Sequence, residues 1–461
     1  MLYQKQIETR YEVDVLVVGG GASGVTAAVA AARQGKKVLV VEKNGYLGGN
    51  AALGLPLLGF LDLNGKQIIA GMAQEWVDRL TARGMCEGHR ECPKHNSVTC
   101  FHSETFKLVA IDWLREEKVD VLLHLEACDT EVNEGRLQKV TFYGKGNRVQ
   151  VEAQMFIDCT GDGDVAYLAG AEYDMGQEDT GVLQPPTVMC TVEGVDTEKL
   201  FDYIEAHPEE MTYSATIDHR PGYDAPYFRA SKNHVFVGLR QTFTRLREEG
   251  KLPVERETLI YIKSPNPGEI YINSTRLLRT DATDVVSLTN AELEGQRQVG
   301  ALVEMLRNEV PGFENAFIAA IQPNLGVRET RRIRCHDVLC ADQAVAGEIP
   351  AETIALSAYK IDIHSGVDRS TIFSTIKEAY GIPYGCLVPK DVSGLMVAGR
   401  NIGVDAKVMA SSRIMPVCMA LGEAAGYGAA LAVERGVEAH EVDVRRVREM
   451  ILENNGMLER P

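Results

Sequence analysis

The sequence has ten cysteines among 461 residues but no Cys-x-x-Cys pair. Close pairs of this kind are typical of redox-active disulfides and of many zinc and iron–sulfur sites, so a redox-active disulfide is not expected. Cysteines scattered singly indicate free thiols in a reducing compartment rather than a disulfide framework. We therefore predict a cytoplasmic protein.

The sequence also lacks an excess of basic residues, with 48 Lys and Arg against 65 Asp and Glu and a formal net charge of −17. Nucleic acids and anionic membranes bind positively charged surfaces, so neither is an expected partner. Residues 1–12 lack the apolar core of a signal peptide, and no apolar run approaches a membrane span. The acidic composition is compatible with a homo-oligomer.

A glycine motif follows an apolar segment near the N-terminus, where residues 13–18 run into Gly19, Gly21 and Gly24 and then into a predicted helix over 22–33. The first glycine permits a tight turn, the second lets the backbone approach a pyrophosphate, and the third lets the helix pack against the strand. The spacing predicts a dinucleotide-binding turn. The alternative is a glycine-rich turn in an unrelated fold.

A second predicted strand, residues 38–41, strengthens the dinucleotide interpretation because it ends at Glu42. A carboxylate at this distance from the glycines can accept both hydroxyls of an adenosine ribose and argues against a 2′-phosphate. No second motif of this kind lies between a strand and a helix. We therefore expect no built-in NAD(P)H domain and a separate electron donor or acceptor.

The pattern of elements predicts an α/β protein in which the two ends of the chain build one domain. Residues 1–170 form its first part, residues 171–380 an inserted domain of different character, and residues 381–461 its second part. The predicted helices are 71–83, 103–117, 289–309 and 415–435, and the predicted strands are 119–125, 131–143 as a hairpin, 149–158 and 394–399.

Residues 84–102 are polar and irregular, which predicts an exposed loop. This segment holds the densest group of soft ligands in the chain, and a zinc ion or an iron–sulfur cluster is the alternative interpretation. Its spacings lack the close pairs that such sites usually show, so we predict no metal. The ligand candidates are Cys86, Cys92 and Cys100 with His89, His95 and His102.

Four blocks of sequence resemble flavin-dependent oxidoreductases with the glutathione-reductase-like FAD-binding fold, which are distantly similar to fumarate reductase and succinate dehydrogenase flavoproteins. The blocks are residues 17–24, 158–164, 324–332, and 397–402 continuing to 413–426. The resemblance implies FAD as the cofactor and a Rossmann-like three-layer FAD-binding domain, with an inserted α+β substrate or cap domain. It also assigns residues to the cofactor. These are Gly19, Gly21, Ala22, Ser23 and Gly24 at the pyrophosphate, Glu42 and Lys43 at the adenosine, Ala127 and Cys128 at the adenine, Gly48, Gly49 and Asn50 at the flavin, Thr160, Gly161 and Asp162 over the dinucleotide, and Gly399, Arg400, Met415 and Gly422 at the ribityl chain and isoalloxazine edge.

Two departures from the family pattern bear on the flavin. Many relatives carry a Thr-His pair a few residues after the Gly-Arg, whereas this chain reads Asn401-Ile-Gly-Val-Asp-Ala-Lys407. A histidine beside the flavin is therefore not expected there. The Gly-Gly-Asn-Ala loop also has no histidine of the kind that carries the flavin covalently in fumarate-reductase-like enzymes, so we predict non-covalent FAD.

The candidate catalytic residues lie in the inserted domain and just after it. Arg328 belongs to a block with three arginines, and an arginine beside a flavin can bind a substrate carboxylate or stabilise an oxyanion. The alternative is a structural network, above all for Arg331 and Arg332. His364 and Asp362 share one face of a predicted strand, which suits an oriented acid–base histidine, with a structural histidine as the alternative.

Tyr384 and Lys407 are lesser candidates for proton transfer. The resulting hypothesis is an FAD-dependent oxidoreductase that transfers a hydride between flavin N5 and a small organic substrate. Dehydrogenation of an alcohol or saturated carbon and reduction of an activated double bond both fit the sequence. The alternative function is an electron-transfer subunit that works with an iron–sulfur partner. A flavin-free binding protein is disfavoured because the cofactor blocks are all intact.

Overall fold

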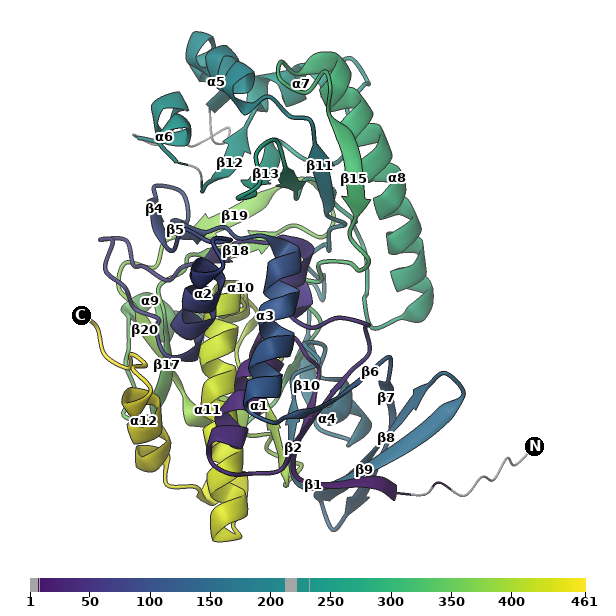
Figure 1. Cartoon of the computed structure of the whole chain (residues 1–461), viewed down its shortest axis with the longest axis vertical. Coiled ribbons are helices and arrows are strands. Elements are labelled where there is room, and N and C mark those ends of the chain that lie inside the picture. Colours follow the sequence, from purple (N-terminus) through teal and green to yellow (C-terminus); the bar gives the residue numbers. More distant parts are fainter. Residues whose placement is uncertain (1–6, 8, 212–221, 232) are drawn as a thin grey trace.

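The computed structural model describes residue 7 and residues 9–211, 222–231 and 233–461. The segment in which the sequence predicts no signal peptide therefore lies partly outside the described residues. Two hydrophobic cores divide the molecule, a larger one around a parallel sheet and a second one around an antiparallel sheet. In Figure 1 the second core lies above the first.

The main sheet is parallel in its centre, in the order β6-β2-β1-β9, and β21 adds to the outer edge of β9. The first half of β9 stays paired with β1 and also pairs with β8, so that β9, β8 and β7 form an antiparallel meander in the same sheet. The carboxyl ends of the parallel strands share one edge, where an α/β sheet binds its ligands. The strand bounds are β1 Thr9–Val18, β2 Val38–Glu42, β6 Asp120–Leu123, β7 Glu126–Asn133, β8 Arg136–Gly144, β9 Asn147–Asp158 and β21 Leu395–Val397.

Helices cover the main sheet, and the closest pair consists of α1 and α11 (Figure 1). A Cβ on Gly422 would collide with the carbonyl oxygen of Ser23, and one on Gly426 with that of Ala27. The hydroxyl of Thr26 donates to the Met419 carbonyl at 2.8 Å. The helices of this part are α1 Ala22–Arg33, α2 Met72–Ala82, α3 Ser103–Glu116, α4 Asp164–Leu168, α9 Ala341–Ala346, α10 Ala406–Ser412, α11 Met415–Arg435 and α12 Val444–Glu453.

Within the described chain, α11 is the one helix long and apolar enough to cross a membrane. Its apolar window is 89% buried inside the protein, against α1 and the main sheet. The apolar composition therefore serves the core of the fold.

The second core is built on a five-stranded antiparallel sheet with the order β12-β13-β14-β11-β15. Helix α8 runs along one side of it and points down toward the main sheet (Figure 1). The elements are β11 Cys190–Glu193, β12 Val235–Gly238, β13 Leu259–Lys263, β14 Ile270–Ile272, β15 Phe317–Ile321, α5 Thr197–Ala206, α6 Ala225–Arg229, α7 Arg240–Glu248 and α8 Val285–Glu309.

Small sheets and 3₁₀ turns connect the two cores. The bounds are β3 Leu57–Leu58, β4 Arg90–Cys92, β5 Asn96–Thr99, β10 Tyr173–Met175, β16 Arg331–Ile333, β17 Thr353–Ser357, β18 Ile361–His364, β19 Thr371–Ser374 and β20 Tyr380–Pro383, with 3₁₀ turns at Gly49–Leu53, Pro208–Met211, Tyr384–Leu387 and Ala439–Glu441.

Two parts of the chain differ from the sequence-based expectation. Ile333 to Ile382 contribute to the larger core, so the inserted part returns to the first domain well before residue 380. Residues 84–102 are not an exposed loop, because strands β4 and β5 cross them and Cys92, Val98 and Cys100 join the second core. The polar composition of this segment wrongly indicated exposure, because the polar residues Ser97 and Thr99 are fully buried.

Candidate functional site

The first cavity lies at the carboxyl edge of the main sheet and has a volume of about 230 Å³. Its walls come from the ends of β1 and β2, the turn after β9, the segment after β21, and the first residue of α11. Residues of α8 and residues 324–327 close it from the second core. A dinucleotide site is expected at this edge.

The glycine turn leaves room for a ligand at one position and for the protein's own backbone at two others. Gly19 has a φ of 101°, and a Cβ there would press on Cys159; a Cβ on Gly24 would collide with the Gly19 carbonyl. Gly21 is different, because the nearest atom to an added Cβ is the Cα of Gly49, at 3.9 Å. The turn therefore fits a pyrophosphate at Gly21.

Glu42 ties the end of β2 to the glycine turn. Its Oε2 accepts from the Gly20 backbone N–H at 2.7 Å, and its Oε1 accepts from the backbone and side-chain nitrogens of Asn44 at 2.8 and 2.7 Å. The side chain is 7% exposed. These bonds fix the carboxylate at the cavity wall, where its remaining lone pairs fit ribose hydroxyls.

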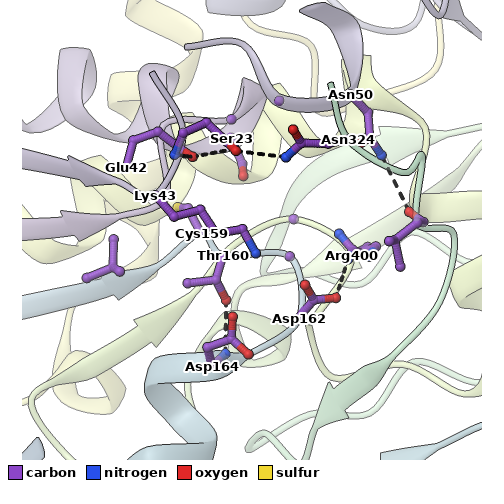
Figure 2. Close-up of a pocket in the computed structure, with 18 of the residues that line it drawn as sticks. Ser23, Glu42, Lys43, Asn50, Cys159, Thr160, Asp162, Asp164, Asn324 and Arg400 are labelled. Atoms are coloured by element: carbon purple, nitrogen blue, oxygen red, sulfur yellow. Dashed lines mark hydrogen bonds and ion pairs between the residues drawn. The ribbon is translucent and has the colours of Figure 1, made fainter. Parts of the chain in front are cut away.

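The turn after β9 is organised by Asp158, which is fully buried. Its carboxylate accepts from the Thr160 backbone N–H and hydroxyl at 3.0 and 2.7 Å and from the Ala166 backbone N–H at 2.9 Å. The Thr160 hydroxyl in turn accepts from the Asp164 backbone N–H at 2.9 Å. The result is a rigid acidic turn along one side of the cavity (Figure 2).

Asp162 and Asp164 are held against cations from later segments. Arg400 forms an ion pair with Asp162, and Thr330 donates to the same carboxylate at 2.7 Å. Arg331 pairs with Asp164 at 3.0 Å. Burial and the neighbouring carboxylates raise the pKa of Asp164 to about 6. Figure 2 shows Arg400 and Asp162 facing each other below Asn50 and Asn324.

Most of the predicted cofactor residues line this cavity. They are Gly19, Gly21, Ala22, Ser23, Glu42, Lys43, Gly49, Asn50, Ala127, Thr160, Gly161, Asp162, Gly399, Arg400 and Met415.

Four of the predicted cofactor residues do not line the cavity. Gly24 and Gly422 serve backbone packing, the first against Gly19 and the second between α11 and α1. Gly48 faces the ring of Phe106. Cys128 is exposed, and its thiol donates to the Thr141 carbonyl. These four residues therefore lie outside the described wall of the cavity.

The sequence reasoning missed part of the cavity wall. Asn324 Nδ2 donates to the Asn44 side chain at 2.7 Å, and Asn50 Nδ2 donates to the Val327 carbonyl at 3.4 Å. Both bonds join the main domain to the inserted part across the cavity. Asn324 is the first residue of the block 324–332 that carries the family resemblance, and its place in that block could have identified it as a cavity residue. The other missed lining residues include Tyr46, Leu288, Glu292, Leu325 and Arg413.

A second cavity, of about 210 Å³, adjoins the first. Either volume exceeds the roughly 30 Å³ that one water molecule occupies in the liquid, so each has room for an organic ligand. Both cavities share one stretch of wall. It consists of Asn50, Val327, Arg400, Arg413 and Met415.

Two predicted catalytic residues, Arg328 and His364, line the second cavity. His364 Nε2 lies 3.5 Å from Asp362 Oδ1, which confirms that both share one face of β18, and His364 Nδ1 lies 3.1 Å from the Thr371 hydroxyl. Burial, and then the nearby guanidiniums of which Arg328 is the first, hold the pKa of His364 well below its usual range. The imidazole is therefore neutral at pH 7.

The other arginines of the 328–332 block have structural roles. Arg331 bonds to the Asp162 carbonyl and to Asp164, and its guanidinium lies 4.2 Å from the ring centroid of Tyr167. Arg332 pairs with Glu329 at 3.0 Å. These contacts favour the structural alternative for both residues.

Two lesser catalytic candidates lie outside both cavities. Tyr384 is buried against α11, donates to the Ala439 carbonyl at 3.1 Å, and has its pKa raised by burial. Lys407 is exposed on α10. Neither residue lines the second cavity, so the structure gives their predicted role in proton transfer no support.

The cysteines and histidines of residues 84–102 are engaged with the protein. The thiol of Cys92 contacts His95 Nδ1 at 3.3 Å, and His89 lies between Thr99 at 2.8 Å and Gln74 at 2.7 Å. Among the described residues no group of three or more His, Cys, Asp or Glu side chains is arranged to hold a metal.

Known proteins resemble this chain at the levels of family, local sequence and fold. A family model described as FAD dependent oxidoreductase matches residues 14–451. A cinnamate reductase of Clostridium sporogenes is 60% identical over 40 residues, which cover 9% of this chain and 6% of that protein. A thiamine thiazole synthase of Aeropyrum pernix is 44% identical over 52 residues, which cover 11% and 19%. The matches thus span less than a fifth of the length of these relatives.

Two solved structures align over nearly the whole chain. A geranylgeranyl bacteriochlorophyll reductase-like protein of Thermoplasma acidophilum has 14% identity and a TM-score of 0.48, and the alignment covers 97% of this chain and 84% of that one. A p-nitrophenol 4-monooxygenase of Pseudomonas putida has 11% identity and a TM-score of 0.45, with coverage of 96% and 84%.

Proposed function

Because the chain belongs to the FAD dependent oxidoreductase family, we propose that it catalyses hydride transfer between flavin N5 and a small organic substrate in the second cavity. FAD is the cofactor of the family, and it supplies a centre that accepts or donates a hydride. The observation that carries the proposal is the wall shared by the two cavities. A ligand in the second cavity can therefore contact residues that also form the wall of the first cavity.

The N-terminus of α11 lies at this shared wall, because its first residue, Met415, lines both cavities. A 21-residue helix presents unpaired backbone N–H groups and the positive end of its dipole there. Both stabilise negative charge. This end of the first cavity therefore suits the reduced, anionic form of the cofactor.

The second cavity supplies groups for a proton and for an oxygen atom of the substrate. We assign the proton transfer to His364, because it lines this cavity with Asp362 Oδ1 3.5 Å from its Nε2 and the Thr371 hydroxyl 3.1 Å from its Nδ1. An anionic substrate would offset the neighbouring guanidiniums that lower the pKa of His364. We assign Arg328 to a substrate oxygen, because a guanidinium presents paired donors to an oxyanion. Electrons come from or leave to a separate carrier in this proposal.

Two reaction directions fit these groups, dehydrogenation of an alcohol or saturated carbon and reduction of an activated double bond. One matched relative is named a cinnamate reductase, which favours the second direction, but its match covers 9% of this chain. We therefore keep both in the proposal and separate them by experiment.

The first measurement is a visible absorption spectrum of the purified protein, repeated on the supernatant after acid precipitation. We expect oxidised-flavin bands that leave with the supernatant, because no histidine stands in the Gly-Gly-Asn-Ala loop. Flavin retained in the precipitate would contradict non-covalent FAD. A colourless protein that does not bind added FAD would overturn the proposal.

The second measurement is anaerobic and uses the FAD-loaded protein. Bleaching by alcohols or saturated acids would establish the dehydrogenase direction, and reoxidation of the dithionite-reduced protein by activated alkenes would establish the reductase direction. If neither the alcohols and saturated acids nor the activated alkenes change the flavin spectrum, the hydride-transfer proposal fails. Stoichiometric iron would instead favour the electron-transfer function, against which the engaged thiols of Cys92 and Cys100 argue.

A further inference from the structure

The second cavity is lined by two arginines that bond only to neutral acceptors. Arg328 donates to the backbone carbonyl of Pro185. Arg413 donates to the side-chain oxygen of Gln184 at 3.1 Å and to the backbone carbonyl of Asp362 at 3.0 Å. By contrast, Arg400 at the same wall is paired with a carboxylate.

Two further arginines are buried next to this pair, and they also bond to carbonyls. Arg256 donates to the Thr275 carbonyl, and Arg276 donates to the carbonyls of three residues between 365 and 370. Arg256 is 4% exposed and Arg276 is 2% exposed. Within the described ranges, no carboxylate lies within 4 Å of Arg328, Arg413 or these two.

The acids nearby do not balance this charge. Asp362 is the one carboxylate in the described wall of the second cavity, and Glu329 is occupied by Arg332. Burial, and then repulsion from Arg256, Arg413 and Arg276, push the pKa of Arg328 well below its usual range. A guanidinium nevertheless stays protonated in proteins. The cluster is therefore a buried excess of positive charge, which is costly until an anion enters.

The rest of the wall is largely apolar, because strands β12 and β13 of the second core present alternate aliphatic side chains to the cavity. Leu55, between the 3₁₀ turn Gly49–Leu53 and β3, and Leu58 of β3 add two more. The aliphatic residues of this wall include Leu55, Leu58, Val235, Val237, Ile260 and Ile262.

We infer that the second cavity selects an organic carboxylate with an apolar body, its carboxylate held by Arg328 and Arg413 and its body packed against the aliphatic wall. The inference rests on the proposed function only in treating this cavity as the substrate site. Two guanidinium forks match the two oxygens of a carboxylate, and an apolar wall matches a ligand whose charge is confined to one end.

The test is calorimetric titration of the FAD-loaded protein with benzoate, hexanoate and 4-phenylbutanoate, each compared with its neutral amide. We expect at least one acid to bind about tenfold or more tightly than its amide, since charge-assisted bonds to a guanidinium are lost in the amide. Phenyl phosphate serves as the competing anion. Tighter binding of phenyl phosphate than of every acid would overturn the carboxylate assignment.

Substitutions test whether Arg328 and Arg413 are the residues that hold the carboxylate. Arg328→Gln and Arg413→Gln should each weaken binding of the acid about tenfold or more and leave binding of the amide unchanged. The matched control is Arg435→Gln, an exposed arginine at the far end of α11 that should change neither. Arg328→Lys and Arg413→Lys keep the positive charge and should bind the acid more tightly than the glutamine variants. The FAD content of every variant reports independently whether the protein is folded.

The inference fails if no acid binds better than its amide, or if the glutamine variants with full FAD content bind the acid as the unmodified protein does. This failure is distinct from that of the proposed function. If acids bind but never change the redox state of the flavin, the hydride-transfer proposal fails and the carboxylate site stands. If neutral substrates change the redox state of the flavin and no acid binds, the hydride-transfer proposal stands and the carboxylate site fails.

Discussion

A methyl group added to Gly21 would meet no protein atom nearer than the Cα of Gly49, 3.9 Å away. Gly21 has a φ of −72°, which any residue adopts, so neither backbone strain nor packing requires glycine there. Gly19 and Gly24, in the same turn, are required by the protein itself. The space in front of Gly21 is therefore free of protein atoms, as a pyrophosphate bound there would require.

Gly21→Ala should lower FAD affinity about tenfold or more, because the methyl group enters space that the pyrophosphate needs. The unfolding temperature of the FAD-free protein should stay within a few degrees of the original. Fluorescence titration of the apoprotein with FAD measures the first quantity, and thermal unfolding the second. The control is Gly300→Ala, at an exposed position of α8 with no atom within 4 Å, which should leave FAD binding unchanged. Equal FAD affinity in both variants would place the pyrophosphate elsewhere.

Gly422→Ala should behave in the opposite way. Its Cβ would strike the Ser23 carbonyl, so α11 must move away from α1, at a cost of about 1–3 kcal/mol in the free energy of unfolding. We expect this loss with and without FAD, measured by urea denaturation of both forms. A loss of FAD affinity without loss of stability in the apoprotein would restore Gly422 to the cofactor site.

Two helices of the main domain were predictable because each has a short-range cause. Helices α1 and α11 begin and end at the predicted residues, and Gly19 and Gly21 of the glycine motif line the first cavity. The domain boundary at residue 380 was not predictable in this way. Ile354 and Ile382 are apolar in either domain, and nothing in their spacing says which of the two cores they join.

The second cavity shows the same limit. Arg328 and His364 were predicted from side-chain chemistry, but Arg413 became a candidate only when the fold placed it beside them. Val235 and Val237 are indistinguishable in sequence from other buried strand residues. Tyr384 was a lesser candidate because it precedes the returning domain, and in the structure its ring packs into the core.

Glu423 should make stability depend on pH. It is 2% exposed in the core between α2 and α11, and burial raises its pKa from 4.5 to about 7. The folded protein therefore binds a proton more tightly than the unfolded chain. Its contribution is most favourable below pH 4.5 and is lost as the pH rises toward 7. The shift corresponds to about 3 kcal/mol.

Glu423→Gln should reduce the fall in unfolding free energy between pH 5 and pH 8 by up to about 3 kcal/mol, because an amide cannot ionise. Urea denaturation at both pH values with saturating FAD measures this difference. Glu434→Gln, an exposed carboxylate on the same helix, is the control and should leave the pH dependence as it is. An unchanged pH dependence in Glu423→Gln would mean that the buried carboxyl has an ordinary pKa.

Arg328→Lys tests whether the reaction needs the guanidinium fork or only a positive charge. Lysine keeps the charge but donates from a single nitrogen, so paired donation to a substrate oxygen or carboxylate is lost. Once a substrate is known, we expect kcat/KM to fall about tenfold to a hundredfold, since one charge-assisted bond contributes about 1.5–3 kcal/mol. Arg334→Lys, on the surface and paired with Glu172 and Asp174, should leave kcat/KM unchanged. Unchanged turnover in Arg328→Lys, with full FAD content, would remove Arg328 from the reaction and leave Arg413 as the arginine that binds the substrate.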